Sequence, residues 1–244
     1  MLVAAAVCPC PPLLVPEVAS GAAPEMADAR AACVDALGVL AAARPDRLLV
    51  VGPAGERELG SYAEGTPGYF RGFGVETDVR LGRAEPETAS ADPGAERPLP
   101  TSLAVAAWLL NSAGWADAPI EGLAVGEPFD AERCIQIGRE AAGAGGERVV
   151  LLVMGDGSAC RTLKAPGYLD ERAAPYDAAA ARALGAADVA ALKGLDLALS
   201  RQLKVSGRAP WQVLAGAAED AGLSGSLLYD DAPYGVGYLV AAWS

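Results

Sequence analysis

The sequence predicts a single α/β domain with a central, largely parallel sheet flanked by helices. Short aliphatic runs such as residues 149–153 carry no polar break, which is typical of parallel strands covered on both faces. A helical pattern separates the first two of these runs, as in a βαβ unit, and each run ends in a turn rich in glycine or proline. No internal repeat or long linker divides the 244 residues, so we expect one domain over residues 1–244.

The first βαβ unit opens the chain. Residues 2–7 predict a buried strand, which ends at the prolines of residues 8–12 because proline cannot donate to a central ladder. Apolar residues then recur at three- and four-residue steps, so a helix is expected from residue 24 to residue 43. Residues 47–51 form the second aliphatic run, and the spacing of the unit makes the two strands parallel.

The pattern weakens after this unit and becomes regular again from residue 101. Residues 69–80 predict short strand pieces, and residues 85–100, rich in proline, alanine and acidic residues, predict a surface loop. Beyond them we expect strands at residues 120–125, 149–153, 226–229 and 235–243, and helices at residues 101–111, 130–142, 176–190, 191–203 and from Pro210 onward. The break between the helices of residues 176–190 and 191–203 is placed near Asp188.

The central run ends in a turn that carries polar side chains. In an open α/β sheet, ligands bind beyond the carboxyl ends of the strands. A strand over residues 149–153 delivers Asp156, Ser158 and Cys160 to that edge, so a site is expected there. The alternative is a polar turn that merely leaves a core strand.

Composition narrows the classes of partner and location. The formal net charge of -12 at pH 7 argues against nucleic acid and anionic membranes. No segment reaches the roughly 18 apolar residues that a membrane span needs. The apolar start of the chain is short and has no basic leader, so a cytoplasmic protein is expected.

Cysteine and histidine usage limit the chemistry. The five cysteines are an odd number and do not indicate a disulfide framework. The chain contains no histidine. A Ser-His-Asp triad, a two-histidine iron site and any zinc site that needs imidazole are therefore excluded.

Four stretches, in this order, resemble the class III extradiol ring-cleavage dioxygenases, most closely the catalytic-subunit type of protocatechuate 4,5-dioxygenase and the related Memo proteins. The stretches are Cys8-Pro9-Cys10-Pro11-Pro12-Leu13-Leu14, Val50-Val51-Gly52-Pro53, Met154-Gly155-Asp156-Gly157-Ser158 and Tyr234-Gly235-Val236-Gly237-Tyr238. The resemblance implies one α/β domain with a pocket at the strand ends. In catalytic members it also implies Fe(II), held by two histidines and a carboxylate, and a further histidine as acid and base.

This chain departs from that pattern at each histidine. The family's histidines fall at Cys10, near Ala54 or Gly55, and at Ala159 or Cys160. Its carboxylate has no sure counterpart, although Asp230 and Asp231 lie in the corresponding late region. We therefore expect a degenerate active site that binds no iron or other cofactor, and ring cleavage does not follow from the resemblance.

Several residues remain candidates for the site. The catalytic candidates are Cys10, Asp156 and Asp231, and the expected pocket residues are Cys10, Gly52, Pro53, Asp156, Ser158, Cys160 and Tyr234. Cys10 is a thiolate ligand, a nucleophile or an inert replacement, and Cys8, Cys10 and Cys160 either converge with Asp156 on a soft metal or do not. Asp156 and Asp231 either face one another for acid/base work or each cap a turn. Arg161 and Lys164 either hold an anionic ligand or are solvated loop charges.

Three functional interpretations stay open. The first is a dioxygenase-like protein without iron that binds a small molecule or a protein partner at the strand ends. The second is an oxidoreductase or other metal- or thiol-dependent enzyme acting on a small aromatic substrate. The third is a non-catalytic subunit of a complex. Assembly into a homo-oligomer is compatible with all three.

Overall fold

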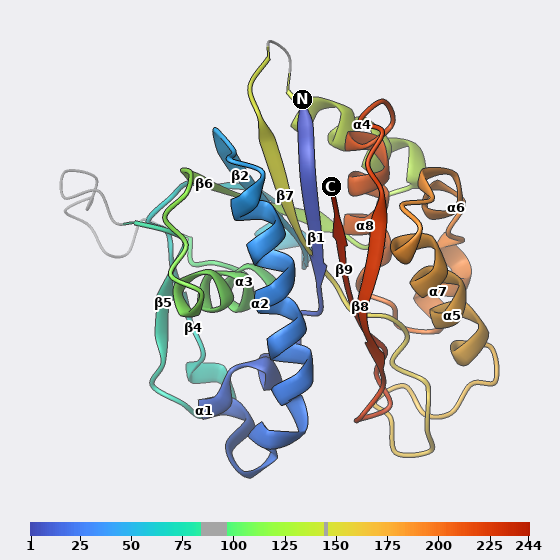
Figure 1. Ribbon diagram of the computed structural model, residues 1–244. Coiled ribbons are helices and arrows are strands. Elements are labelled where there is room, and N and C mark those ends of the chain that lie inside the picture. Colours follow the sequence, from blue (N-terminus) through green and yellow to red (C-terminus); the bar gives the residue numbers. More distant parts are fainter. Residues whose placement is uncertain (84–96, 144–145) are drawn as a thin grey trace.

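A computed structural model describes residues 1–83, 97–143 and 146–244. Within those ranges the chain forms a seven-stranded sheet and a two-stranded sheet (Figure 1). The strands are β1 (Leu2–Cys8), β2 (Arg47–Ala54), β3 (Gly60–Tyr62), β4 (Pro67–Tyr69), β5 (Asp78–Arg80), β6 (Ile120–Gly126), β7 (Val149–Met154), β8 (Gly225–Asp231) and β9 (Tyr238–Trp243). The helices are α1 (Pro16–Ala19), α2 (Ala27–Ala42), α3 (Thr101–Ser112), α4 (Ala131–Ala141), α5 (Ala173–Gly185), α6 (Val189–Lys193), α7 (Leu197–Gln202) and α8 (Arg208–Ala217), with 3₁₀ turns at Pro12–Leu14, Ser20–Met26, Glu56–Glu58 and Arg71–Phe73.

The large sheet has the order β3-β6-β2-β7-β1-β9-β8. Strands β6, β2, β7 and β1 pair in parallel, whereas β3, β9 and β8 pair antiparallel at the two sides. The expected α/β domain with adjacent strands at residues 2–7, 47–51 and 149–153 is confirmed. The carboxyl ends of the parallel strands therefore share one edge, as the site hypothesis requires.

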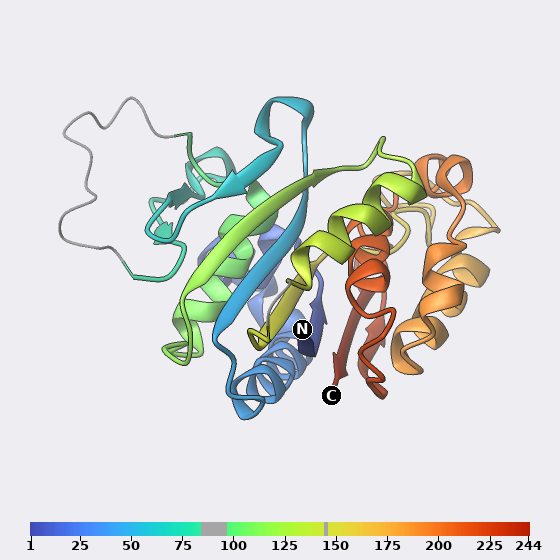
Figure 2. The same ribbon diagram turned by 90° about the horizontal axis from the view of Figure 1, so that it is seen from above.

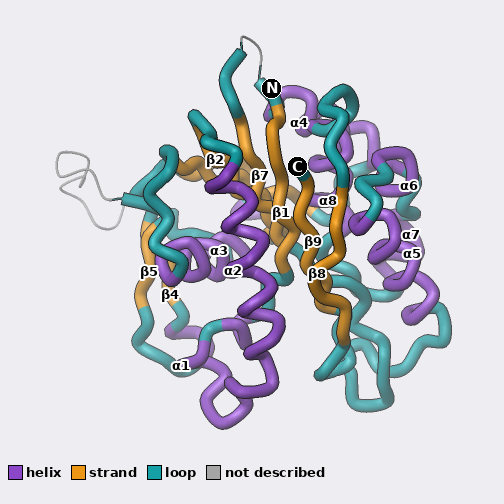
Figure 3. The backbone as a smooth tube through the Cα atoms, in the orientation of Figure 1, coloured by secondary structure: helices purple, strands orange, loops and turns teal. Residues whose placement is uncertain are grey.

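Helices cover both faces of the large sheet (Figures 2 and 3). One face packs against α2 and α3, and the other packs against α4, α5 and α8. Every residue of β7 and β9 is buried, which explains why their sequences are continuous apolar runs without alternation. The polar groups that matter for function are thereby confined to the ends of the strands.

The second half of the chain differs from expectation in its helices and late strands. The two expected helices of residues 176–190 and 191–203 are three, because Asp188 and Asp196 cap α6 and α7 through backbone N–H groups of Ala191 and Leu199. The late strands are shifted relative to the sequence prediction. β8 runs on to Asp231, and β9 begins only after the turn at Gly235, whose φ is 76°.

The expected surface loop of residues 85–100 lies largely outside the described residues, which resume at Arg97. Leu99 and Pro100 are buried, so the last part of that segment belongs to the core and the prediction was wrong there. The strand pieces expected within residues 69–80 are present as the ends of the β4–β5 hairpin. In the ranges that the structure covers, no helix is long and apolar enough to cross a membrane.

Helices α4 and α8 cross at two glycines. A Cβ on Gly138 would overlap the carbonyl oxygen of Val213, and a Cβ on Gly216 would overlap the carbonyl oxygen of Ile135. The two backbones therefore approach closely enough that no side chain fits between them. This contact fixes how α4 and α8 lie over the sheet.

We expect Gly138→Ala to lower the free energy of unfolding by about 1–3 kcal/mol, because the added methyl overpacks the α4–α8 crossing. Gly38→Ala on α2 is the control, since nothing lies within 4 Å of its Cβ position. That change should raise stability by about 0.5–1 kcal/mol through helix propensity. Urea unfolding followed by circular dichroism measures both, and equal effects would contradict the packing argument.

Candidate functional site

Three side chains stand side by side where β7, β1 and β9 reach the carboxyl edge. The pairing of Val7 with Ala241, continued along both strands, brings Cys10 level with Tyr238. Both side chains belong to the core on the α2 and α3 face of the sheet. Asp156 follows Gly155, which faces Gly207 on the opposite side, so alternation turns Asp156 to the same face. We call Asp156, Cys10 and Tyr238 the strand-end row.

Asp156 is tied to its neighbours on both sides. The backbone N–H of Cys10 donates to Asp156 Oδ1 at 2.8 Å, and the backbone N–H of Asp156 donates to Ser206 Oγ at 3.0 Å. Burial raises the pKa of Asp156 to about 7, and the Cys10 N–H offsets this only in part. A carboxyl group with that pKa exchanges its proton near neutral pH.

The other two members of the row stay neutral at that pH. Burial raises the pKa of the Cys10 thiol well above its usual value, and the nearby charge of Asp156 raises it further. Burial, followed by the charges of Asp156 and Cys10, likewise raises the pKa of the Tyr238 phenol. Cys10 is therefore a thiol and not a thiolate nucleophile, and Tyr238 is a hydrogen-bond donor.

Asp231 lies at the same edge but does not pair with Asp156. It is level with Tyr238 on β8 and is exposed. Three strand spacings separate β8 from β7, which corresponds to roughly 14 Å between the two backbones. The side chain of Asp231 accepts a hydrogen bond from the N–H of Ala232 at 2.7 Å. Asp231 therefore caps its own turn, and it does not form a carboxylate pair with Asp156.

A wide groove opens beside the row. We call it the strand-end groove; it has a volume of about 810 Å³ and is lined by Leu13, Arg161, Thr162, Leu163, Lys164, Pro166, Leu169, Pro233 and Tyr234. Its walls are mainly apolar. Leu13 and Tyr234 also pack against the core cluster to which Cys10 and Tyr238 belong, so the groove borders that cluster. No residue of the strand-end row lines the groove itself. Tyr234 is the expected pocket residue that lines it.

A buried carboxylate fixes the arginine of the groove. Asp177 is 1% exposed and accepts hydrogen bonds from the N–H and Oγ of Ser158, both at 2.7 Å, and from Arg161 Nη1 at 3.0 Å. Arg161 is thus held in one orientation while it remains partly open to the groove. Lys164, on the same loop, is exposed and has no ion pair with a described residue.

Four of the expected pocket residues have structural roles instead. Ser158 is fully buried and donates its hydroxyl to Asp177. The Cys160 thiol is also buried and lies 3.5 Å from the carbonyl oxygen of Leu203. Gly52 and Pro53 lie at the end of β2 beneath α3. There the hydroxyl of Ser102 donates to Pro53 O at 2.7 Å and fills the space above Gly52. These residues do not line the groove.

The cysteines do not converge on a metal. Cys8 contacts Cys33, which raises the pKa of its thiol, and Cys160 points to a backbone oxygen. In the described part of the chain, no group of three or more cysteine, aspartate or glutamate side chains is arranged to hold a metal ion. Cys8, Cys10 and Cys160 therefore do not gather around Asp156 as a soft-metal site would require.

Sequence reasoning missed Glu127, Asp177, Ser206 and Tyr238. Glu127 directly follows β6, so applying the strand-end rule to that strand would have found it. Burial raises its pKa to about 8, although Arg208 opposes this, and its Oε1 has no partner among the described residues. The others had no comparable signal, because Ser206 and Asp177 reach the site from distant loops and helices.

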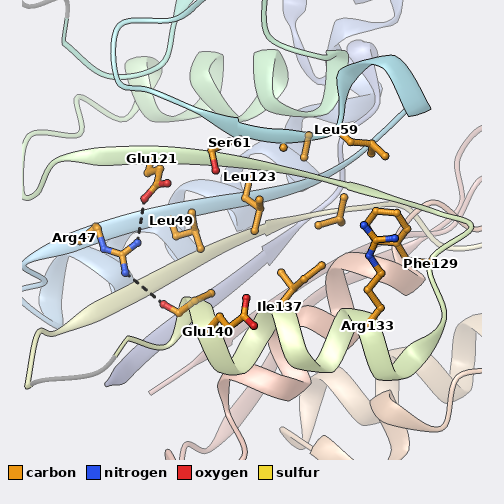
Figure 4. A pocket seen from close by; sticks show the side chains of 14 residues that line it. Arg47, Leu49, Leu59, Ser61, Glu121, Leu123, Phe129, Arg133, Ile137 and Glu140 are labelled. Carbon is orange, nitrogen blue, oxygen red and sulfur yellow. Dashed lines mark hydrogen bonds and ion pairs between the residues drawn. The ribbon is translucent and has the colours of Figure 1, made fainter.

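A second hollow lies on the opposite face of the sheet, over β6 (Figure 4). It has a volume of about 470 Å³ and lies between α4 and β3. Arg133 stacks on the ring of Phe129 at one end, and Arg47 forms an ion pair with Glu121 at the other. The residues that line this hollow include none of those expected for the site, whereas Arg161, Lys164 and Tyr234 line the strand-end groove, which we therefore take as the candidate site.

Comparisons with known proteins bear on the fold alone. No family model and no curated protein matches the chain. Among solved structures, the crystal structure of an uncharacterized protein, JW3007 from Escherichia coli K12, is similar with a TM-score of 0.53 and 13% sequence identity. The alignment covers 99% of each chain. The similarity shows that the whole α/β fold, and not a fragment of it, recurs in a natural protein.

The two buried carboxyl groups predict an unusual dependence of stability on pH. Below about pH 4, Asp156 and Glu127 are protonated in both the folded and the unfolded chain. Between that pH and their folded pKa values of about 7 and about 8, the unfolded chain releases these protons and the folded chain keeps them. The contribution of both groups to stability is therefore lost as the pH rises through this window.

We expect Asp156→Asn and Glu127→Gln each to reduce the loss of unfolding free energy between pH 5 and pH 8. The amides keep the shape and the acceptor oxygen but have no proton to release. Urea titrations at the two pH values measure the difference. Asp35→Asn, an exposed change on α2, is the control. An unchanged pH slope in both buried variants would show that these carboxyl groups titrate normally.

Proposed function

We propose that this chain is a histidine-free relative of the class III extradiol dioxygenases that binds a small aromatic acid in the strand-end groove. The observation that carries the proposal is Arg161, which Asp177 holds in place at the wall of an otherwise apolar groove. Lys164 adds a second positive charge on the same loop. A guanidinium fixed in advance recognises a carboxylate at little cost in side-chain entropy.

The shape of the groove suits a ligand with an apolar body. Its volume of about 810 Å³ lies within the range typical of small-molecule sites. Leu163 and Leu169 are 62% and 45% exposed, and Tyr234 lines the same groove. A ring placed between these side chains removes their apolar surface from water, while its acid group reaches Arg161 or Lys164.

The iron centre that the resemblance implies does not fit this chain. Its donor set needs imidazole, and the chain has none. At the positions in question, Cys10 has a buried neutral thiol and Cys160 faces a backbone oxygen. The neutral thiol also weighs against a mechanism in which Cys10 acts as the nucleophile. Ligand binding, without ring cleavage, is the function that these residues support.

Protocatechuate and benzoate are the probes for the groove, and both should bind, more weakly as salt is added. Lys164→Gln should weaken binding about 2- to 5-fold, because it removes one exposed attraction of up to about 1 kcal/mol. Isothermal titration calorimetry measures the dissociation constants. Arg201→Gln, an exposed change on α7 outside the groove, is the matched control and should have no effect. A dissociation constant that changes neither with added salt nor in Lys164→Gln would contradict this assignment.

The protein purified without added metal should carry no stoichiometric iron and should not cleave catechols. The neutral Cys10 thiol is not the imidazole donor that the iron site needs, and it is itself open to oxidation. Metal analysis and oxygen consumption with protocatechuate test this expectation. Near one iron per chain, together with oxygen uptake that Cys10→Ala abolishes, would establish a modified dioxygenase instead.

A further inference from the structure

The second hollow, which runs along the outer part of the sheet between β3 and α4, offers exposed apolar surface (Figure 4). Its floor carries Leu49 from β2 and Leu123 and Val125 from β6. Leu59, just before β3, and Ile137, on α4, line its two sides. Leu49 and Val125 are buried, whereas Leu59, Leu123 and Ile137 are only half-buried. An elongated strip of aliphatic side chains therefore remains open to a ligand.

The two ends of the hollow differ in charge (Figure 4). At one end, Arg47 forms ion pairs with Glu121 and Glu147, both at 3.3 Å, so its charge is balanced. At the other end, the guanidinium of Arg133 lies 3.6 Å from the centre of the Phe129 ring and forms no ion pair with a described residue. Of the described arginines that line the hollow, only Arg133 thus remains available to an anionic group.

A buried arginine fixes the ring on which Arg133 stacks. Arg208 is fully buried and donates from Nη2 to the carbonyl oxygen of Phe129 at 2.8 Å, and also to that of Glu127. The Phe129 ring lies against Gly126, where an added Cβ would stand 3.1 Å from the ring atom Cε1. Because both the backbone and the ring of Phe129 are held, Arg133 is oriented before a ligand arrives, which lowers the entropy cost of binding an anion.

The acidic side chains of α4 leave Arg133 unneutralised. Glu140 lies seven residues beyond Arg133, or roughly 10 Å along the helix axis, and accepts a hydrogen bond from Gln136 Nε2 at 2.9 Å. Within the described chain, Asp130 Oδ1 caps α4 by accepting the backbone N–H of Arg133 at 2.8 Å and forms no ion pair with its guanidinium. A ligand's anionic group can therefore take the position beside Arg133.

We propose that this hollow binds a medium-chain aliphatic acid, with its carboxylate on Arg133 and its chain along β6 over Leu123 and Leu49. From Glu121 to Val125 the strand rises by roughly 13 Å, which matches the extended chain of decanoate. The volume of about 470 Å³ lies within the range of small-molecule sites. An aliphatic chain placed there removes both its own surface and that of the leucines from water. The inference does not depend on the strand-end groove, since the described residues that line the two sites do not overlap.

Decanoate, hexanoate and decylamine are the probes, and isothermal titration calorimetry of the full chain measures their dissociation constants. Decanoate should bind, and hexanoate should bind about 10-fold more weakly or less, because its shorter chain covers fewer of the apolar side chains. Arg133→Gln should weaken decanoate binding about 5- to 10-fold, since the lost hydrogen bonds are charged but exposed. Arg182→Gln, an exposed change on α5 outside the hollow, is the matched control and should leave the constant unchanged.

Nuclear magnetic resonance locates the ligand on the protein. Decanoate should shift the amide signals of Ser61, Leu123 and Ile137, which line the hollow, and benzoate should not. Shifts at Arg161 and Lys164 in place of these would assign decanoate to the strand-end groove and overturn the second site.

Three calorimetric results would also overturn the inference. They are absence of decanoate binding, equal affinity of decanoate for the wild type and Arg133→Gln, and tighter binding of decylamine than of decanoate. The last result would mean that the carboxylates of the hollow, and not Arg133, select the ligand. If decanoate binds here as expected and benzoate does not bind at all, the proposed function fails and this inference stands.

Discussion

The burial of β7 between β2 and β1 is the constraint on which the rest of the structure depends. All six residues of this strand are buried, and its two neighbours pair with it in parallel. Parallel pairing forces the chain to cross over between strands, which places helices on both faces and leaves only the strand ends open. Asp156 stands just beyond the end of β7, so the strand that organises the core also leads into the turn that carries Asp156, Ser158 and Arg161.

A protein without histidine must obtain groups that titrate near neutral pH in another way. Here the fold buries carboxyl groups at strand ends, where desolvation raises the pKa of Asp156 and Glu127 into the neutral range. The same burial keeps Cys10 and Tyr238 protonated. A fully buried carboxylate, Asp177, is used differently, since two hydrogen bonds from Ser158 and one from Arg161 hold it as a fixed anchor. Asp177 and Asp156 thus take different roles, because Asp177 forms an ion pair with Arg161 and Asp156 forms none with a described residue.

The resemblance to the extradiol dioxygenases rests on the four sequence stretches. Our proposal keeps the strand-end location that this resemblance implies and replaces ring cleavage by the binding of an acid to Arg161, which Asp177 holds at the groove. The structural neighbour JW3007 supports the fold over the full length, while the function rests on the residues of this chain.

The sequence by itself determined the sheet and the edge where a site belongs, because buried parallel strands leave uninterrupted aliphatic runs and end in glycine and proline. It also predicted Cys10, Asp156 and Tyr234 as site candidates, and Arg161 and Lys164 as charges able to hold an anion. Only the tertiary structure decided which candidates meet. It separated Asp231 from Asp156 by three strand spacings, buried Ser158 and Cys160, and brought Tyr238 and Ser206 near Asp156. Those outcomes depend on strand order and on contacts between distant segments, which a local pattern does not encode.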